Sequence, residues 1–280
     1  PFCDGYILSI IGIALTLLAP QLGLSSVMTG LIGSSALIGL FLGGLIFGYV
    51  TDLIGRQTMY LIDLSVFVVA SVLQFFVGAG WQLLIIRFIL GIAVGADYPI
   101  ASSLMAEFTP RRHRGFLLSF LIFGWWVGAA TAYVVGYLLI GVSEDSWRWI
   151  LASSAVPAAI ILLLRLGTPE SPRWLASKGR TDEAREIVKK VFGENVELGN
   201  LPPEPQKTSF WRIFRDGYGK RTTFVGLFWA LQVIPTFAIL TFSPMVLEAF
   251  GLNGGNLEYL GSVIISAFAV VGVLPALFLV

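Results

Sequence analysis

Long apolar runs alternate with short polar stretches along most of this chain. A membrane-spanning helix needs about 20 mainly apolar residues, and the runs reach that length. They are apolar on all sides, whereas the strands of a membrane barrel are shorter and apolar only at alternate positions. The pattern therefore predicts spanning helices near residues 2–22, 27–50, 58–78, 82–106, 115–140, 149–166, 222–247 and 258–280.

The composition supports a membrane protein and argues against other classes. Of the 280 residues, 56% are hydrophobic and 12% are charged, with a net charge of +1. A soluble domain needs more charged surface, and this net charge gives no general attraction to nucleic acid. One cysteine, Cys3, and one histidine, His113, argue against a disulfide framework, a metal centre and a Ser–His–Asp site. We expect an all-α polytopic membrane protein that is not an enzyme and uses no cofactor or metal.

Basic residues are distributed unevenly over the loops, and their distribution predicts the orientation. Arg56 follows the second span, Arg111, Arg112 and Arg114 follow the fourth, and many Lys and Arg residues lie within 167–221. Three of the opposite loops hold no Lys or Arg, and the fourth ends with Arg148. Because cytoplasmic loops carry the excess of Lys and Arg, the first span enters the membrane from the cytoplasm.

The long basic loop divides the chain into three expected parts. We predict a six-helix bundle at 1–166, a cytoplasmic linker at 167–221 and two helices of a second bundle at 222–280. In the linker, Thr181 is expected to cap an amphipathic helix, and the proline-rich residues 201–205 are expected to be extended. Its basic residues predict a solvated surface and the topology signal in preference to nucleic-acid binding.

Two polar motifs lie at the cytoplasmic ends of the spans. The sequence GYVTDLIGRQ at 48–57 contains Asp52, which can accept backbone N–H bonds, and Arg56, which supplies a counter-charge after a glycine turn. The sequence TPESPRWL at 168–175 places Glu170 and Arg173 three residues apart at a membrane boundary. Such opposite charges could link helix ends in one state and release them in another.

These motifs resemble signature loops of the major facilitator superfamily of transporters, after helix two and after helix six. The second motif is similar to that of sugar porters and of related branches for phosphate, aromatic acids and organic ions. Gln57 departs from the family pattern, which has a basic residue there. The resemblance implies the first six-helix bundle of a twelve-helix fold and the start of the second bundle. We therefore expect a piece of a longer protein, which by itself does not transport.

The resemblance also implies a cytoplasmic gate of charged residues. Glu107 and Arg114 belong to an acidic-then-basic motif at the end of the fourth span, similar to the family's gate motif there. The implied gate consists of Asp52, Arg56, Glu107, Arg114, Glu170 and Arg173, which should cluster on the cytoplasmic face.

Two carboxylates lie inside predicted spans, Asp4 in the first and Asp97 in the fourth. Ionisable groups in a membrane are expensive and face the bundle interior or a water-filled cavity. Counted from the outer ends of their helices, Asp97 lies roughly 22 Å deep and Asp4 about 27 Å deep, which predicts one shared polar cavity. Gly91 and Gly95 lie on one face with Arg87, and this face permits close helix packing.

The intramembrane carboxylates suggest proton carriers, because burial favours the protonated form of a carboxyl group. Asp97 resembles the helix-four acid of proton-coupled phosphate and metabolite symporters, and Asp4 resembles the first acid of their helix-one motif, whose second acid is Ile7 here. The alternative for Asp97 is an ion pair with Arg87, about 15 Å away along one helix. The expected proton-coupling and substrate residues are Asp97, Asp4, Gln232, Tyr98 and Arg87.

The resemblance implies secondary active transport, by proton-coupled symport of an organic acid, a phosphate-like anion or a sugar through alternating access. Pro235 and Pro244 are expected to break the seventh span beside Gln232, where the family closes over substrate. A sugar is disfavoured because the sugar-porter pattern has two adjacent glutamines here and another in helix five. No nucleotide-binding loop of the Walker type is present, so ATP is not the expected driver.

The alternative is a non-transporting receptor or interaction protein on the same membrane scaffold. Intramembrane carboxylates favour transport over this alternative. The expected partners are a small-molecule substrate, protons and the lipid bilayer, with no nucleic acid. We expect a monomer that crosses the cell membrane several times.

Overall fold

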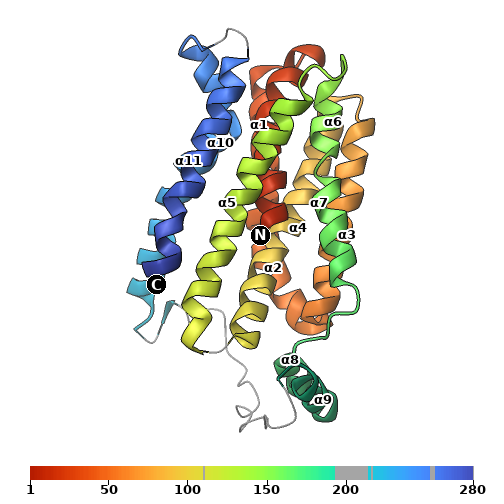
Figure 1. The fold of residues 1–280 in the computed structure, drawn as a ribbon, viewed down its shortest axis with the longest axis vertical. Coiled ribbons are helices and arrows are strands. Elements are labelled where there is room, and N and C mark those ends of the chain that lie inside the picture. The colour runs from red at the N-terminus through yellow and green to blue at the C-terminus, as the bar shows by residue number, and fades with distance from the viewer. Residues whose placement is uncertain (110, 193–213, 216, 253–255, 280) are drawn as a thin grey trace. The chain divides into compact units, whose positions relative to one another are not determined.

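The computed structural model describes residues 1–279 except 110, 193–213, 216 and 253–255. The described residues form helices and connecting turns without strands (Figure 1). The helices are α1 (Phe2–Gln21), α2 (Ser26–Ile54), α3 (Arg56–Leu73), η1 (Gln74–Phe76), α4 (Gly80–Phe108), η2 (Arg111–His113), α5 (Arg114–Leu139), α6 (Ser146–Ala152), α7 (Ala155–Arg165), α8 (Pro172–Ser177), α9 (Thr181–Phe192), α10 (Gly219–Ala249) and α11 (Leu257–Leu279). The predicted proline-rich segment 201–205 lies outside the described residues.

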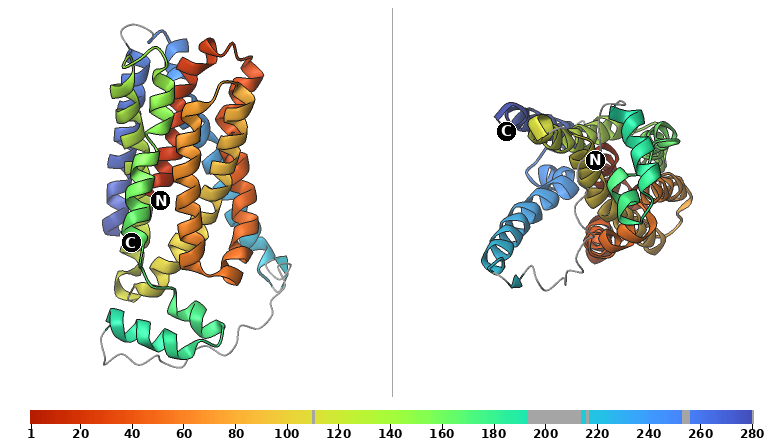
Figure 2. Two further views of the ribbon diagram at one scale, coloured as in Figure 1. Left: turned by 90° about the vertical axis from the view of Figure 1, so that its right-hand side faces the viewer. Right: turned by 90° about the horizontal axis from the view of Figure 1, so that it is seen from below.

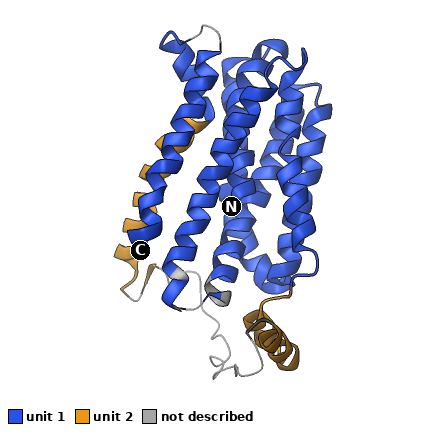
Figure 3. Cartoon of the chain, viewed as in Figure 1, with its two compact units in different colours: residues 1–168, 241–280 blue, residues 169–240 orange. Residues whose placement is uncertain are grey.

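The chain divides into two compact units (Figure 3). Unit 1 comprises Pro1–Thr168 and Thr241–Val280, and unit 2 comprises Pro169–Leu240. In unit 1 the long helices lie side by side with their axes roughly along the same line, and consecutive helices run in opposite directions (Figures 1 and 2). The α2–α3 and α4–α5 connections and the end of α7 lie at one end, and the α1–α2 and α5–α6 connections lie at the other (Figure 1). The first end carries Arg56 and Arg112 and is therefore the cytoplasmic end.

Eight helical stretches of the described chain are long and apolar enough to cross a membrane, so the predicted fold class is confirmed. They are Phe2–Gln21, Ser26–Ile54, Arg56–Phe76, Gly80–Met105, Gly115–Leu139, Ser146–Arg165, Gly219–Ala249 and Leu257–Leu279.

The predicted break in the seventh span is wrong. Helix α10 is continuous from Gly219 to Ala249, through both Pro235 and Pro244. Each proline removes one backbone N–H bond, but an open break would leave several peptide groups unpaired in hydrocarbon. A continuous helix therefore costs less than the interruption that the prolines suggested.

The sixth span differs from its prediction in the opposite way, because it consists of two helices. Helices α6 and α7 are separated at Ser153 and Ser154, whose hydroxyls donate to the carbonyls of Ile150 and Leu151 at 2.6 Å each. Pro157 in the first turn of α7 has no N–H to donate to the Ser153 carbonyl. Serine hydroxyls that compete for backbone carbonyls and a nearby proline together account for the break.

Glycine contacts set the distance between α2 and α4. A Cβ atom at Gly39 would lie 2.2 Å from the Phe88 carbonyl oxygen, and one at Gly91 would lie 2.0 Å from the Ala36 carbonyl oxygen. Gly95 is equally close to α2, because its Cβ would lie 2.3 Å from the Leu40 carbonyl oxygen. The predicted close-packing face of Gly91 and Gly95 is confirmed, and small residues let these backbones touch.

Helix α1 packs against α5 through the same device. A Cβ at Gly5 would lie 2.0 Å from the Trp125 carbonyl oxygen, and one at Gly128 would lie 2.1 Å from the Phe2 carbonyl oxygen. The residues of α1 from Cys3 to Leu15 are all buried. The chain start lies about midway along the helices of unit 1 (Figure 1), so this contact positions the first turn of α1 inside the bundle.

Arg148 is the exception to the charge asymmetry of the loops, and its contacts explain its position. Its Nη1 donates to the carbonyls of Phe75 at 2.7 Å and Val77 at 2.5 Å. The guanidinium also lies 4.4 Å from the centroid of the Trp147 ring. Arg148 thus joins α6 to the end of α3 at the outer end, where two carbonyls need a donor.

Unit 2 contains a short helix that the sequence analysis missed. Ser171 caps α8 by accepting from the Trp174 N–H at 3.2 Å, and Pro172 is its first residue. Thr181 is the first residue of α9 and does not cap it as predicted. The exposed Arg180 bonds Glu183 at 2.7 and 2.6 Å, and this guanidinium lowers the pKa of the Glu183 carboxyl.

The α2–α4 contact predicts a large effect of a single methyl group. Gly39→Ala should lower the free energy of unfolding by about 1–3 kcal/mol, because the added Cβ overlaps backbone that cannot move aside. Gly30→Ala is the matched control on α2, since nothing lies within 4 Å of its Cβ position. Thermal unfolding in detergent measures both variants. Equal melting temperatures for the two would contradict the close contact.

Candidate functional site

Asp4 and Asp97 are brought together inside unit 1. Asp4 lies in the first turn of α1, and Asp97 lies two residues after Gly95 in α4. The Oδ2 atoms of both carboxylates lie 3.1 Å from the nitrogen of Pro1. The exposed fractions of Asp4 and Asp97 are 1% and 2%. The two residues predicted for proton coupling therefore approach the same atom in the buried interior of the bundle.

A third carboxylate, Asp63 of α3, belongs to the same region. It is 1% exposed, and neither of its carboxylate oxygens has a hydrogen-bond partner in the described chain. It lies close enough to Asp97 and Asp4 for their charges to act on it. Asp4, Asp63 and Asp97, named here the carboxylate cluster, come from three different helices.

Arg87 lies apart from the carboxylate cluster. Its guanidinium is 1% exposed, and its Nη2 donates to the Ile7 carbonyl oxygen at 3.3 Å. Its Nε and Nη1 have no hydrogen-bond partner, and no ion pair within 4.0 Å joins it to Asp97 in the described part of the chain. The structure thus gives no support to the ion-pair alternative for Asp97. Ile7 occupies the position where the resembled helix-one motif has its second acid.

Tyr98 and Gln232 are not buried with the cluster, although Tyr98 lies within range of the charges of Asp4 and Asp97. The side chain of Tyr98 is 45% exposed, and its hydroxyl lies against the indole of Trp125. Gln232 is exposed in the part of α10 that belongs to unit 2. Its Nε2 lies 3.5 Å from Thr236 Oγ1, whose hydroxyl donates to the Gln232 carbonyl at 2.7 Å.

The cytoplasmic end of unit 1 carries the first gate motif. Helix α2 ends at Ile54, and Gly55 has a φ of 114°, a conformation that glycine adopts without strain. Arg56 then starts α3, and Asp52 lies on the exposed surface of the last turn of α2. Gln57 is 9% exposed, and its Nε2 donates to the Arg165 carbonyl at 3.0 Å. Its amide therefore bonds the end of α7.

The other gate residues are described only in part. Glu107 lies in α4 and Arg114 begins α5, and their side chains lie outside the described residues. Glu170 and Arg173 belong to unit 2, where Glu170 Oε1 accepts from the Ser171 N–H at 2.8 Å and Arg173 is exposed in α8. The cytoplasmic cluster of all six residues stays a prediction.

Comparison with known proteins identifies the family. The family described as "Sugar (and other) transporter" matches residues 7–280. The chain belongs to this family. With its eight candidate spans, it is therefore a multi-pass membrane protein of a transporter family.

Relatives in this family share long stretches with the chain. YaaU and YgcS of Escherichia coli are 45% and 42% identical over 98% and 99% of it, and YgcS is named an inner membrane metabolite transport protein. The chain spans 61% of the length of each. The arabinose-proton symporter of Bacillus subtilis is 30% identical over 99% of this chain and 62% of that protein.

Solved structures of the same superfamily share the fold. The Escherichia coli xylose transporter XylE, in a partially occluded inward-open conformation, matches with a TM-score of 0.80 and 25% identity. The match covers 96% of this chain and 68% of that chain. The expected major facilitator fold is thereby confirmed.

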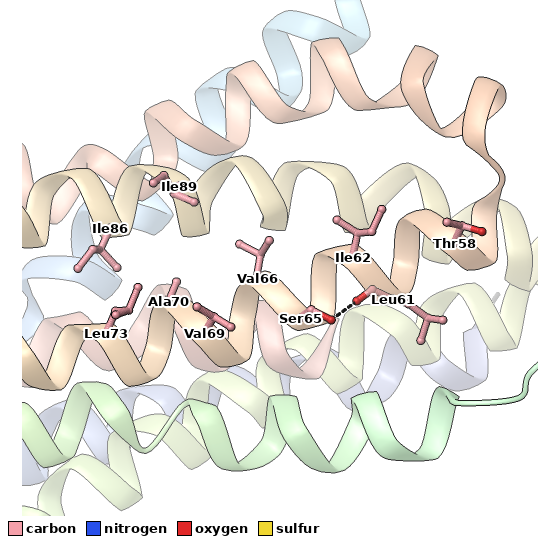
Figure 4. A pocket seen from close by; sticks show the side chains of 10 residues that line it. All are labelled: Thr58, Leu61, Ile62, Ser65, Val66, Val69, Ala70, Leu73, Ile86 and Ile89. Atoms are coloured by element: carbon pink, nitrogen blue, oxygen red, sulfur yellow. Dashed lines mark hydrogen bonds between the residues drawn. The ribbon is translucent and has the colours of Figure 1, made fainter.

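Two open, mainly apolar hollows are found in the described part of the structure, and neither is lined by Asp4, Asp63 or Asp97. The larger, about 590 Å³, is lined by Leu61, Ser65, Val69 and other side chains of α3 with Ile86 and Ile89 of α4 (Figure 4). The second, about 520 Å³, lies beside Phe2 and Tyr6. Both are lined mainly by apolar side chains, so they suit contact with lipid or with another helix better than a polar substrate.

Asp63 is the residue of this family member that the sequence analysis missed. The run YLIDLSVF at 60–67 carries an ionisable group inside an apolar span, which is the same signal that marked Asp4 and Asp97. No group of three or more His, Cys, Asp or Glu residues in the described ranges is placed to hold a metal ion.

The buried guanidinium of Arg87 predicts an unusual stability effect. Arg87→Met keeps most of the side-chain volume and removes an unpaired buried charge, so it should raise the free energy of unfolding by about 1–4 kcal/mol. Arg148→Met is the matched control, and it should lower that free energy, because two carbonyls lose their donor. Thermal unfolding of both variants gives the sign. A similar loss in both would show that Arg87 has a stabilising partner.

Proposed function

We propose that the full-length protein to which this chain belongs is a secondary active transporter that couples proton movement to the symport of a small polar metabolite by alternating access. The substrate is an organic acid, a phosphate-like anion or a sugar. The binding site lies between two helical bundles near the middle of the membrane, as in other transporters built from repeats.

The observation that carries this proposal is the meeting of the Asp4 and Asp97 carboxylates, which are 1% and 2% exposed, inside the helix bundle. Two ionised carboxylates so close together repel each other in an apolar interior, where the nitrogen of Pro1 is the cation that lies beside both of them in the described chain. Proton binding removes this repulsion, and water entering from either side of the membrane would reverse it. A receptor or a purely structural protein has no use for such a costly arrangement, whereas a proton-coupled transporter needs one.

Names of relatives support proton coupling and a polar substrate. One relative is named an arabinose-proton symporter, and a more similar one is named a metabolite transport protein. In this proposal Asp4 and Asp97 carry the proton, and Tyr98, Arg87 and Gln232 serve substrate binding and orientation. The cytoplasmic gate is formed by Asp52, Arg56, Glu107, Arg114, Glu170 and Arg173.

Asp97→Asn tests the coupling, because asparagine keeps the shape of the side chain and carries no proton. Proteoliposomes with an inward proton gradient are given labelled L-arabinose, D-xylose, succinate or phosphate. The full-length wild-type protein should accumulate at least one of them, and Asp97→Asn in that protein should slow this accumulation about 100-fold, as expected for the loss of a proton-transferring group.

Asp145→Asn serves as the control for this experiment, because it removes a carboxylate that lies at the outer end and pairs with Arg148 at 3.3 Å. It should accumulate the solute like the wild type. Accumulation by Asp97→Asn at the wild-type rate would reject the coupling role of Asp97.

A further inference from the structure

Helix α3 carries a polar stripe on its buried face. Gln57, Tyr60 and Asp63 follow one another at intervals of three residues, and their exposed fractions are 9%, 5% and 1%. Residues three apart lie on the same face of a helix, so these three side chains lie one above the other. Leu64 and Phe67 continue this face with apolar side chains toward the outer end. The polar stripe is therefore interrupted after Asp63, and the next buried polar side chains of this region are Ser71 and Gln74 near the outer end.

The two ends of this stripe meet different surroundings. At the end of the stripe that lies deeper in the bundle, the charges of Asp97 on α4 and Asp4 on α1 act on Asp63. The Cys3 side chain of α1 also lies within range of Asp63. At the cytoplasmic end, the Arg165 guanidinium of α7 lies 4.8 Å from the Tyr60 ring centroid.

Gln57, one turn further toward the cytoplasm, bonds the Arg165 backbone carbonyl. The nitrogen of Pro1 also lies beside Asp4 and Asp97, and its charge acts on Asp63.

A structural role does not account for Asp63. A carboxylate kept for stability is paired or accepts hydrogen bonds, and both oxygens of Asp63 lack a partner. Its burial without a partner lowers stability, which is tolerated where a residue serves function. Asp63 lies between the Asp4–Asp97 pair and the cytoplasmic end of the bundle, a position that suits the transfer of protons between them.

We propose that Asp63 relays protons between the Asp4–Asp97 pair and the cytoplasm, along the stripe of Tyr60 and Gln57. This inference rests on the proposed proton coupling and adds a third carrier to it. When the cytoplasmic side opens, the O–H bond of the Asp97 or Asp4 carboxyl breaks and the Asp63 carboxylate accepts the proton. The O–H bond of Asp63 then breaks in turn, and water that enters from the cytoplasm beside Tyr60 takes the proton away.

The test compares two transport modes in proteoliposomes, using the labelled solute that the wild-type protein accumulates among L-arabinose, D-xylose, succinate and phosphate. Gradient-driven accumulation requires the release of a proton to the inside in every cycle. Exchange of labelled for unlabelled solute at equal concentrations requires no such release. A relay residue is therefore needed for accumulation and dispensable for exchange, whereas a residue needed only for folding affects both modes.

Asp63→Asn should slow accumulation about 100-fold and leave exchange near the wild-type rate. Asp63→Glu should restore most of the accumulation with a shifted pH profile, because it keeps a proton-carrying group in a slightly different position. Asp145→Asn, which removes a carboxylate at the outer end, should behave like the wild type in both modes.

Two results would overturn the relay. Asp63→Asn could accumulate solute at the wild-type rate with an unchanged pH profile, which would show that no proton passes through Asp63. Alternatively, Asp63→Asn could lose accumulation and exchange together, which would assign it a structural role. Failure of the wild-type protein to accumulate any of the solutes under a proton gradient would instead contradict the proposed function itself.

Discussion

The cost of burying charge among apolar helices is the constraint on which this structure depends. An ion removed from water loses several kcal/mol of solvation even after the protein relaxes around it. The carboxylate cluster and Arg87 nevertheless lie in the interior, with exposed fractions of 1–2%. No ion pair within 4.0 Å joins Arg87 to the cluster in the described chain, and the nitrogen of Pro1 lies beside only Asp4 and Asp97, so proton binding remains the way to neutralise the other carboxylate charge. This separation makes the cluster responsive to protons.

Close helix contacts hold the carboxylates in place. Gly91 and Gly95 bring α4 against α2, and Gly5 brings α1 against α5, in each case at distances that leave no space for a Cβ atom. Asp97 follows Gly95 by two residues, and Asp4 immediately precedes Gly5. Helix packing therefore fixes the backbones that carry the two acids. The carboxylates themselves cannot do so, since like charges repel each other. The same packing excludes water from the cluster in this conformation.

Much of this arrangement could be predicted from the sequence, because a membrane imposes simple rules. Apolar runs of sufficient length predicted every span, and the acids within those runs predicted that Asp4 and Asp97 would meet. Asp63 is also an acid within an apolar run, in the third span, so the sequence carried the same signal for it. The relation of Arg87 to Ile7 could not be predicted, because the contact joins two helices about 80 residues apart and depends on their rotation.

The incorrect predictions concern local breaks in helices. Pro235 and Pro244 suggested an interruption that α10 does not have. Ser153 and Ser154, in contrast, interrupt a span that the apolar pattern predicted to be one helix. Proline position alone does not decide such cases, since neighbouring helices and hydroxyl groups determine whether freed carbonyls find partners. At Gln57, where the sequence departs from the family motif, the side-chain amide donates to the Arg165 carbonyl, a contact between α3 and α7 that the sequence did not predict.

The central claim is that solute and protons cross the membrane together through this protein. The most direct measurement records the external pH of weakly buffered proteoliposomes while solute enters down its own concentration gradient, without an imposed proton gradient. The account predicts that the external solution becomes more alkaline as solute enters through the wild-type protein, because each solute molecule takes protons inward with it. Entry of solute with no change in external pH would contradict the account.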